Sequence, residues 1–254
     1  MSDQTPSPAS EMDFFEHLSE LRRRLLISFL AIGVFAVAGY AFSQQAFFVL
    51  SQPFFEAFPD DILIGTGPAE AFLLRIKMSL FLGFLVALPV LFHQLWLFIS
   101  PGLHSHEKRM AIPFIFITSL LFLTGVWFCY NLVLPFAFEF FRAQYDAIGQ
   151  VTPTIRVSEY ISLLLKALFG FGLIFETPVL AFFLGRLGLI DQKDLIDWGR
   201  YAVVIIFLIS AILTPPDVIT QLLMAIPLML LYALSILIVK FTHRKERGPI
   251  LEEE

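Results

Sequence analysis

The chain has 254 residues, of which 57% are hydrophobic and only 15% are charged, and its formal net charge is −5. Thirty phenylalanines and several uncharged runs of 18 or more residues indicate an integral membrane protein and exclude an ordinary soluble domain. The single cysteine, Cys129, excludes an intrachain disulfide and a cysteine-based metal site.

The predicted fold is a single all-α membrane domain covering residues 1–254, with six spans. Polar residues 1–12 are expected to be disordered. Residues 13–24 have apolar side chains at helical spacing, which predicts an amphipathic helix lying at the membrane interface. The spans are expected at about residues 25–42, 78–99, 111–138, 161–185, 201–213 and 218–239, followed by a tail at 240–254.

The fifth apolar run is unusually short. Its 13 residues, 201–213, rise about 20 Å as a helix, whereas the hydrocarbon core of a bilayer is about 30 Å thick. This run is therefore either a short span or half of a re-entrant hairpin. Between the first two spans, Phe54, Phe55 and Phe58 indicate a cap on the membrane surface.

Prolines occur in or at the end of most of the spans. An internal proline removes a backbone donor and tends to kink its helix. The sequence therefore predicts kinked helices that form a curved, concave bundle. These prolines are Pro89, Pro113, Pro135, Pro178 and Pro227.

Basic residues predict the orientation in the membrane. Twelve of the 17 Lys and Arg residues lie in the N-terminal region, the two expected loops after the second and fourth spans, and the tail. The positive-inside rule then places both termini in the cytoplasm. Arg22–Arg24 and the apolar run with Ala36-Val37-Ala38 also resemble a cleavable signal peptide, but the 21 residues before Arg22 are long and acidic for one.

Glu176 lies inside the fourth expected span, where Lys166 is the only other ionisable residue. A carboxylate at the centre of a spanning helix costs about 2.5–3.5 kcal/mol on insertion scales. Two interpretations remain open. The carboxyl is a structural group, protonated or satisfied by a neighbouring helix, or it is a polar contact point for another membrane helix or a substrate.

No pattern in the sequence indicates catalysis or a cofactor. The Gly-x-Gly pairs at Gly65 and Gly170 lack the residues of a phosphate loop, and no nucleophile elbow or zinc-protease helix occurs. His104 and His106 have metal-ligand spacing but no third ligand. We therefore expect neither an enzyme nor a bound cofactor or metal.

Four motifs in chain order resemble those of the TatC family, the core receptor of twin-arginine protein export. Their order and spacing agree with the six-span topology over nearly the whole chain, and any one of them alone would be weak. The motifs are His17-Leu-Ser-Glu-Leu-Arg-Arg-Arg24; Phe98-Ile-Ser-Pro-Gly-Leu103 with His106-Glu-Lys-Arg109; Phe175-Glu-Thr-Pro178; and Leu213-Thr-Pro-Pro-Asp217 with Gln221.

The resemblance implies a function and its partners. TatC-like proteins bind the twin-Arg signal peptides of folded proteins at the cytoplasmic (inner) membrane and organise the single-span proteins TatA and TatB. The proton gradient drives export, and no nucleotide is hydrolysed. The expected partners are therefore TatA, TatB, twin-Arg peptides, the lipid bilayer and further copies of the chain within the complex, but no nucleic acid.

The site residues follow from the resemblance and from charge. An Arg pair requires carboxylates, and the topology places Glu20 and Glu107 together at the cytoplasmic surface. The open alternatives are an ordinary helix pair of Glu20 with Arg23 or Arg24, and a solvated loop charge for Glu107. The remaining residues expected at the peptide site are Arg22, Phe98 and Leu103. Glu176 is the expected polar site within the membrane. A partner helix is expected to dock on Thr214, Asp217 and Gln221.

Two other functions compete with export. A secondary transporter of a small solute would show inverted repeats and polar groups clustered at the midplane. Here Glu176 is nearly alone there, and the other expected polar groups lie near the two surfaces. A purely structural membrane scaffold would not need the pair of Glu20 and Glu107.

Overall fold

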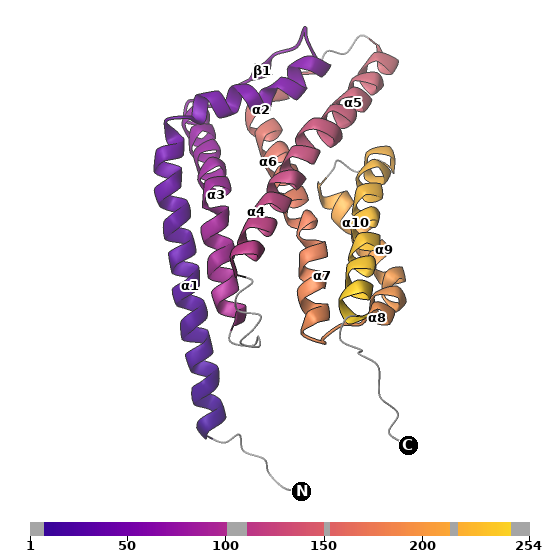
Figure 1. Ribbon diagram of the computed structural model, residues 1–254. Helices are drawn as coiled ribbons and strands as arrows, with labels where there is room; N and C mark the ends of the chain where they lie inside the picture. Colours follow the sequence, from indigo (N-terminus) through magenta and orange to yellow (C-terminus); the bar gives the residue numbers. More distant parts are fainter. Residues whose placement is uncertain (1–7, 101–110, 150–152, 214–217, 245–254) are drawn as a thin grey trace, which may run out of the picture. The chain divides into compact units, whose positions relative to one another are not determined.

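The computed structural model describes residues 8–100, 111–149, 153–213 and 218–244 and is almost entirely helical (Figure 1). It divides into two compact units. One holds the chain up to Ala46 with Arg75–Ser119, and the other holds Phe47–Leu74 with the chain from Leu120 onward. The helices are α1 (Pro8–Tyr40), α2 (Ser43–Ala57), α3 (Glu70–Ile99), α4 (Ala111–Phe128), α5 (Leu134–Ile148), α6 (Val157–Phe175), α7 (Thr177–Arg186), α8 (Gln192–Asp197), α9 (Gly199–Leu213) and α10 (Val218–Arg244).

Four segments of the described chain are long and apolar enough to cross a membrane: Glu70–Ile99, Ala111–Ile148, Val157–Arg186 and Met224–Phe241. Leu18–Tyr40 passes the same test together with Ser43–Ala57, and Gly199–Ala211 is a shorter apolar helix. An all-helical, multi-pass membrane protein is therefore confirmed. The count of six, the cytoplasmic termini and the concave shape stay predictions.

Two expected boundaries at the N-terminus are wrong. Residues 8–12, expected to be disordered, belong to α1, which begins at Pro8. Proline suits the first helical position because its missing N–H has no helical partner there. The helix expected at 13–24 is present but does not end there, because α1 continues without a break to Tyr40; its place at the membrane interface stays a prediction. No proline or glycine lies between Pro8 and Gly33 to interrupt it.

The third expected span continues beyond residue 138. A π-helical turn at Cys129–Val133 connects α4 to α5, and Pro135 falls in the first turn of α5. Pro135 has no N–H to donate to a carbonyl of the preceding turn, and it lies directly after the π-helical turn, where the regular hydrogen bonding is already altered. Helix α5 runs on to Ile148, about ten residues beyond the expected end of the third span.

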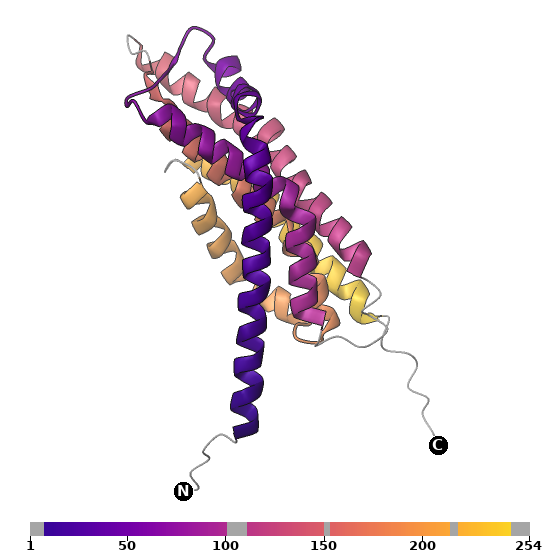
Figure 2. The same ribbon diagram turned by 90° about the vertical axis from the view of Figure 1, so that its left-hand side faces the viewer.

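Small residues bring α1 and α3 into backbone contact within the first unit. The Ser79 hydroxyl donates to the Ala36 carbonyl oxygen at 2.8 Å. A Cβ on Gly83 would lie 2.5 Å from the Ala36 nitrogen and 2.8 Å from the Ile32 oxygen. Ser79, Gly83 and Ala87 recur every four residues, the small-residue spacing by which membrane helices approach closely. Figure 2, turned by 90° from Figure 1, shows α1 as one uninterrupted helix.

A second close crossing joins α4 to α6 in the other unit. A Cβ on Gly125 would lie 2.6 Å from the Phe171 carbonyl oxygen, and one on Gly172 would lie 2.4 Å from the Phe122 ring. Phe122 and Phe171 are fully buried. Each glycine thus accepts an aromatic residue of the other helix, which fixes the crossing point.

Phe54 and Phe58 belong to the core of the second unit, and the position of their segment on the membrane surface stays a prediction. Phe54 is 0% exposed and lies 5.4 Å from the Tyr160 ring and 5.2 Å from the Phe58 ring, between centroids. The Tyr160 hydroxyl donates to the Leu50 carbonyl. Only Phe55, at 41% exposure, remains at the surface. Burial of these aromatic rings against Tyr160 of α6 stabilises α2 within this unit.

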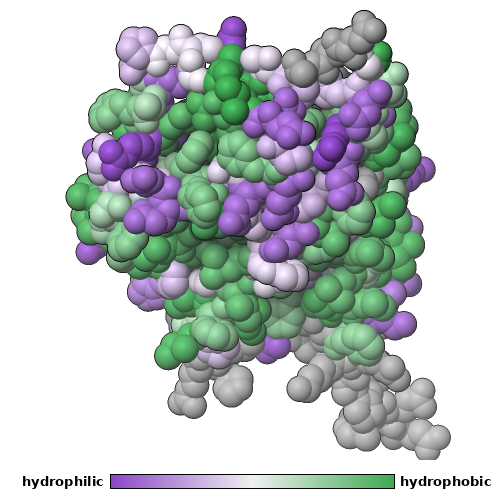
Figure 3. All heavy atoms as spheres, turned by 90° about the horizontal axis from the view of Figure 1, so that it is seen from above, coloured by the Kyte–Doolittle hydropathy of each residue, from purple (hydrophilic) through white to green (hydrophobic). Residues whose placement is uncertain are grey.

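Glu70 connects two loops of the same unit. Its carboxylate accepts hydrogen bonds from the backbone N–H groups of Thr66, Gly67 and Ser158. A short parallel ladder beside it pairs Leu63 with Ile155 and continues to Arg156. Helices α3 and α6 therefore begin from a common anchor. Figure 3, a view from above, shows hydrophilic residues (purple) side by side with hydrophobic residues (green) on this face.

Candidate functional site

A polar cluster links α1 to α3 in the first unit. Arg24 donates from Nη2 to Glu20 Oε1 at 2.7 Å and from Nη1 to Gln94 Oε1 at 3.4 Å. Glu20 and Arg24 meet because residues four apart lie on one face of a helix. Gln94 is 8% exposed, and apart from His93 the neighbouring residues of α3 are apolar. The cluster therefore fixes the acidic group of α1 against a second helix.

The ion pair with Arg24 occupies part of the hydrogen-bonding capacity of Glu20. The helix pair with Arg24, left open as an alternative on sequence, is present in the structure. The Glu20 side chain is nevertheless 31% exposed, and a carboxylate has about four lone-pair sites, so it retains capacity for a further donor. Glu20 is thus a pre-oriented and partly neutralised acceptor.

The other residues expected around a bound peptide do not all lie beside this cluster. Phe98 lies four residues after Gln94 and hence on the same face of α3. Arg22 is exposed and lies two residues, about 200°, from Glu20 around α1, so the two do not share a face. Glu107 and Leu103 lie outside the described residues.

Glu176 occupies the break between α6 and α7. It is 6% exposed, and its Oε1 atom is buried without a hydrogen-bond partner. The backbone of Phe122 in α4 lies against the carboxyl group. Lys166 is exposed and ten residues away, about 15 Å along the helix, so it does not pair with Glu176. The carboxyl group is therefore buried within the protein, and its Oε1 atom is free to accept a further hydrogen bond.

The break itself follows from Pro178, which lies in the first turn of α7. Proline cannot donate to the carbonyl four residues earlier, and the freed oxygen of Ile174 instead accepts from the Thr177 hydroxyl at 2.6 Å. The interruption predicted at Pro178 is therefore present. It places Glu176 where helical hydrogen bonding is already interrupted.

The last two helices form a tight pair, α9 and α10. The Gln221 amide donates to the Phe207 carbonyl of α9 at 2.9 Å. Gln221, expected at a docking surface, is thus an internal link between α9 and α10. Thr214 and Asp217 lie outside the described residues.

Helix α9 leaves apolar side chains uncovered. Val204 is 67% exposed and Leu208 is 61% exposed, one turn apart, while Ile206 between them is 8% exposed and packs inward. Helix α9 is 15 residues long, in agreement with the short fifth run. Its outer face could therefore receive another apolar helix.

Arg24 and Gln94 were not singled out from sequence as site residues. Gln94 carried a usable signal, because an amide in an apolar helix must find a partner. Arg24 had appeared only as one of two alternatives for pairing with Glu20. Within the described part of the chain, no group of three or more His, Cys, Asp or Glu residues could hold a metal ion.

Comparisons with known proteins agree on one family. The family model described as Sec-independent protein translocase protein (TatC) matches residues 16–227. Sec-independent protein translocase protein TatC of Magnetococcus marinus is 42% identical over 240 residues, which are 94% of this chain and 88% of that protein. The Aquifex aeolicus protein of the same name is 41% identical over 236 residues, 93% of this chain and 98% of that protein.

Solved structures agree as well. The crystal structure of twin arginine translocase receptor TatC matches with a TM-score of 0.81 and 41% identity, covering 90% of this chain and all of that one. A second crystal structure of the same receptor, in DDM, gives a TM-score of 0.80 and 42% identity over 87% of this chain and 98% of the other.

Proposed function

The chain belongs to the TatC family of Sec-independent protein translocase proteins, and from that premise we propose that it is the receptor for twin-arginine signal peptides of folded proteins. It is a multi-pass membrane protein, and the family is a translocase component rather than a class of enzyme. The proposal places it in the cytoplasmic membrane with both termini in the cytoplasm. It acts there with TatA, TatB and further copies of itself, driven by the proton gradient.

One observation carries the proposal, the cluster of Glu20, Arg24 and Gln94. An Arg side chain presents a planar fork of donors that suits a fixed carboxylate. Arg24 fixes Glu20 at 2.7 Å, and the 31% exposure of Glu20 leaves room for a second guanidinium. Phe98, on the same face of α3 as Gln94, offers apolar contact to the peptide. Glu107 supplies the second carboxylate of the proposed site.

Replacing Glu107 by Ala is expected to weaken binding of a twin-Arg peptide at least tenfold. A hydrogen bond to a charged group contributes about 1.5–3 kcal/mol, and about 1.4 kcal/mol corresponds to a factor of ten. Replacing the peptide's two Arg by Lys should weaken binding too, because the forked geometry is lost. Fluorescence anisotropy of a labelled peptide on the purified chain measures both effects.

The matched control is Glu139→Ala, which also removes one negative charge. Glu139 is an exposed residue of α5 outside the proposed site, so this variant should bind as the native chain does. Full affinity in Glu107→Ala would move the binding site elsewhere. An equal loss of peptide affinity in both variants would show that the effect comes from the change in net charge and not from the site.

The outer face of α9 is proposed to dock the single helix of TatA or TatB. Cysteines at Val204 and Leu208 should crosslink to a cysteine in the partner helix, whereas a cysteine at the buried Ile206 should not. The background is Cys129→Ser, which removes the native thiol. Crosslinks confined to α3 or α4, with none along α9, would contradict this docking face.

The runner-up function, transport of a small solute, has less support. It requires polar groups gathered at the midplane of the spans. The buried side-chain carboxyl of Glu176 lies against the Phe122 backbone of α4, with one oxygen lacking a hydrogen-bond partner. Membership of a protein-translocase family also favours export over solute transport.

A further inference from the structure

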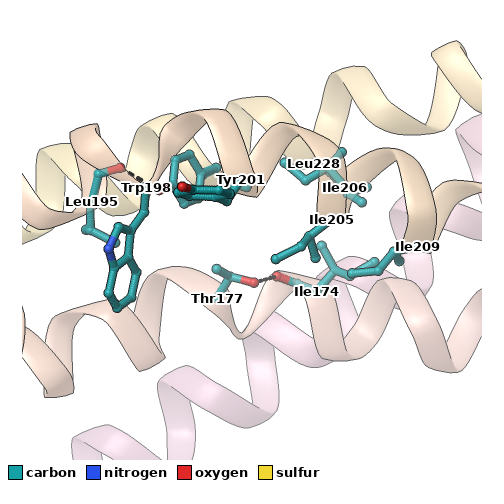
Figure 4. A pocket seen from close by; sticks show the side chains of 11 residues that line it. Ile174, Thr177, Leu195, Trp198, Tyr201, Ile205, Ile206, Ile209 and Leu228 are labelled. Atoms are coloured by element: carbon teal, nitrogen blue, oxygen red, sulfur yellow. Dashed lines mark hydrogen bonds between the residues drawn. The ribbon is translucent and has the colours of Figure 1, made fainter.

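An apolar slot of about 370 Å³ lies within the second unit. Its walls come from the junction of α6 with α7 and from α9 and α10, and α8 closes one end (Figure 4). Ligand pockets commonly have volumes of about 300–1,000 Å³. Tyr201, Ile205 and Ile209 line the slot at intervals of four residues along α9, so it is elongated, over about 12 Å.

Two of the polar groups in its wall, the hydroxyls of Thr177 and Tyr232, already form hydrogen bonds within the protein. The Thr177 hydroxyl donates to the Ile174 carbonyl at 2.6 Å, and the Tyr232 hydroxyl donates to the Leu195 carbonyl at 2.6 Å. The rest of the wall in this region is largely aliphatic, from Ile205, Ile206, Ile209 and Leu228 among others. An occupant therefore gains from apolar contact and finds little to hydrogen-bond, which suits a hydrocarbon chain.

One end of the slot has the character of a membrane interface. Trp198 and Tyr201 line that end and are 58% and 56% exposed. Tryptophan and tyrosine are enriched where the hydrocarbon meets the headgroups. The guanidinium of Arg200 lies 4.8 Å from the centre of the Tyr201 ring, so a positive charge is held beside the opening.

The acidic residues nearby do not neutralise this charge by direct pairing. Asp191 and Asp194 form the capping box at the start of α8 and accept backbone hydrogen bonds there. Within the described residues, Arg24, Arg142 and Arg156 form ion pairs, whereas Arg200 is exposed and forms none. Arg200 thus remains available to an anion from the membrane.

We propose that this slot binds one phospholipid with an anionic headgroup, with an acyl chain between α7 and α9 and the phosphate on Arg200. Basic positions beside clefts between membrane helices are suited to anionic headgroups.

The test is native mass spectrometry of the full chain, stripped of lipid in detergent and titrated with dioleoyl phosphatidylglycerol or dioleoyl phosphatidylcholine. We expect one phosphatidylglycerol to bind in preference to phosphatidylcholine. Ile205→Trp fills the slot and should weaken binding at least tenfold. Arg200→Gln should retain binding but lower the preference for phosphatidylglycerol about fivefold.

The matched control is Ile226→Trp. Ile226 is 57% exposed, against 54% for Ile205, and lies two residues, about 200°, from the slot residue Leu228 around α10. It should bind lipid as the native chain does. Thermal melting establishes that each variant is folded, and Ile209→Trp replaces Ile205→Trp if the latter is not.

Three results would overturn the proposal. Native lipid affinity in a folded slot-filling variant would exclude the slot as the lipid site. An unchanged headgroup preference in Arg200→Gln would show that Arg200 does not contact the phosphate. If Ile205→Trp kept its lipid but lost the crosslinks of α9 to the single-span partner, the slot would belong to that partner helix.

Discussion

Gly83→Leu is expected to remove most of the folded, monodisperse protein. Even one added carbon at Gly83 would lie within 2.8 Å of three backbone atoms of α1, in Ile32 and Ala36. Backbone atoms in a helix cannot move singly, so α1 and α3 must separate. Overpacking by a few methylene groups costs about 1–3 kcal/mol, and separation also breaks the buried bond from Ser79 to Ala36. Thermal melting of detergent-purified protein measures the loss.

The control for this change lies on α1 itself. Gly33 is exposed, and a Cβ there would meet nothing within 4 Å. Gly33→Leu should therefore melt at or above the native temperature, because leucine favours a helix by up to about 1 kcal/mol over glycine. Equal melting temperatures for the two leucine variants would show that the α1–α3 contact does not limit stability.

Glu176→Ala is expected to lower export of a folded twin-Arg precursor at least tenfold while leaving peptide affinity nearly native. The carboxyl is buried against α4 with one oxygen unused, so its expected role is to receive a polar group of a partner helix during assembly. Glu176→Gln should retain most export, since an amide hydrogen-bonds without a charge. Export into vesicles and peptide anisotropy, measured on the same variants, separate the two activities.

Each alternative for Glu176 gives a distinct result. Native export by Glu176→Ala would make the residue structural only. Loss of peptide binding would place it in the signal-peptide site. Loss of export in the Gln variant equal to that in the Ala variant would mean that the negative charge itself is needed.

The sequence by itself determined the class of protein, most of the helix positions and the family. Uncharged runs must become helices in a membrane, because only a helix satisfies its own backbone there. The predicted run 201–213 therefore lies within α9, and the predicted start of the last span agrees with α10 at Val218. Pro178 likewise lies at a helix break, because it lacks a backbone donor, although Pro89 and Pro227 lie inside the continuous helices α3 and α10.

Only the tertiary structure decided which side chains meet. The pairing of Arg24 with Glu20 was one of two local alternatives, and contact with Gln94, 70 residues away, fixed it. Gly83, Gly125 and Gly172 carry no periodic signal that identifies their partners. The burial of Phe54 and the internal bond of Gln221 also depend on a second helix. Local periodicity specifies a helix and its apolar character, whereas contacts between distant residues depend on packing that no single segment contains.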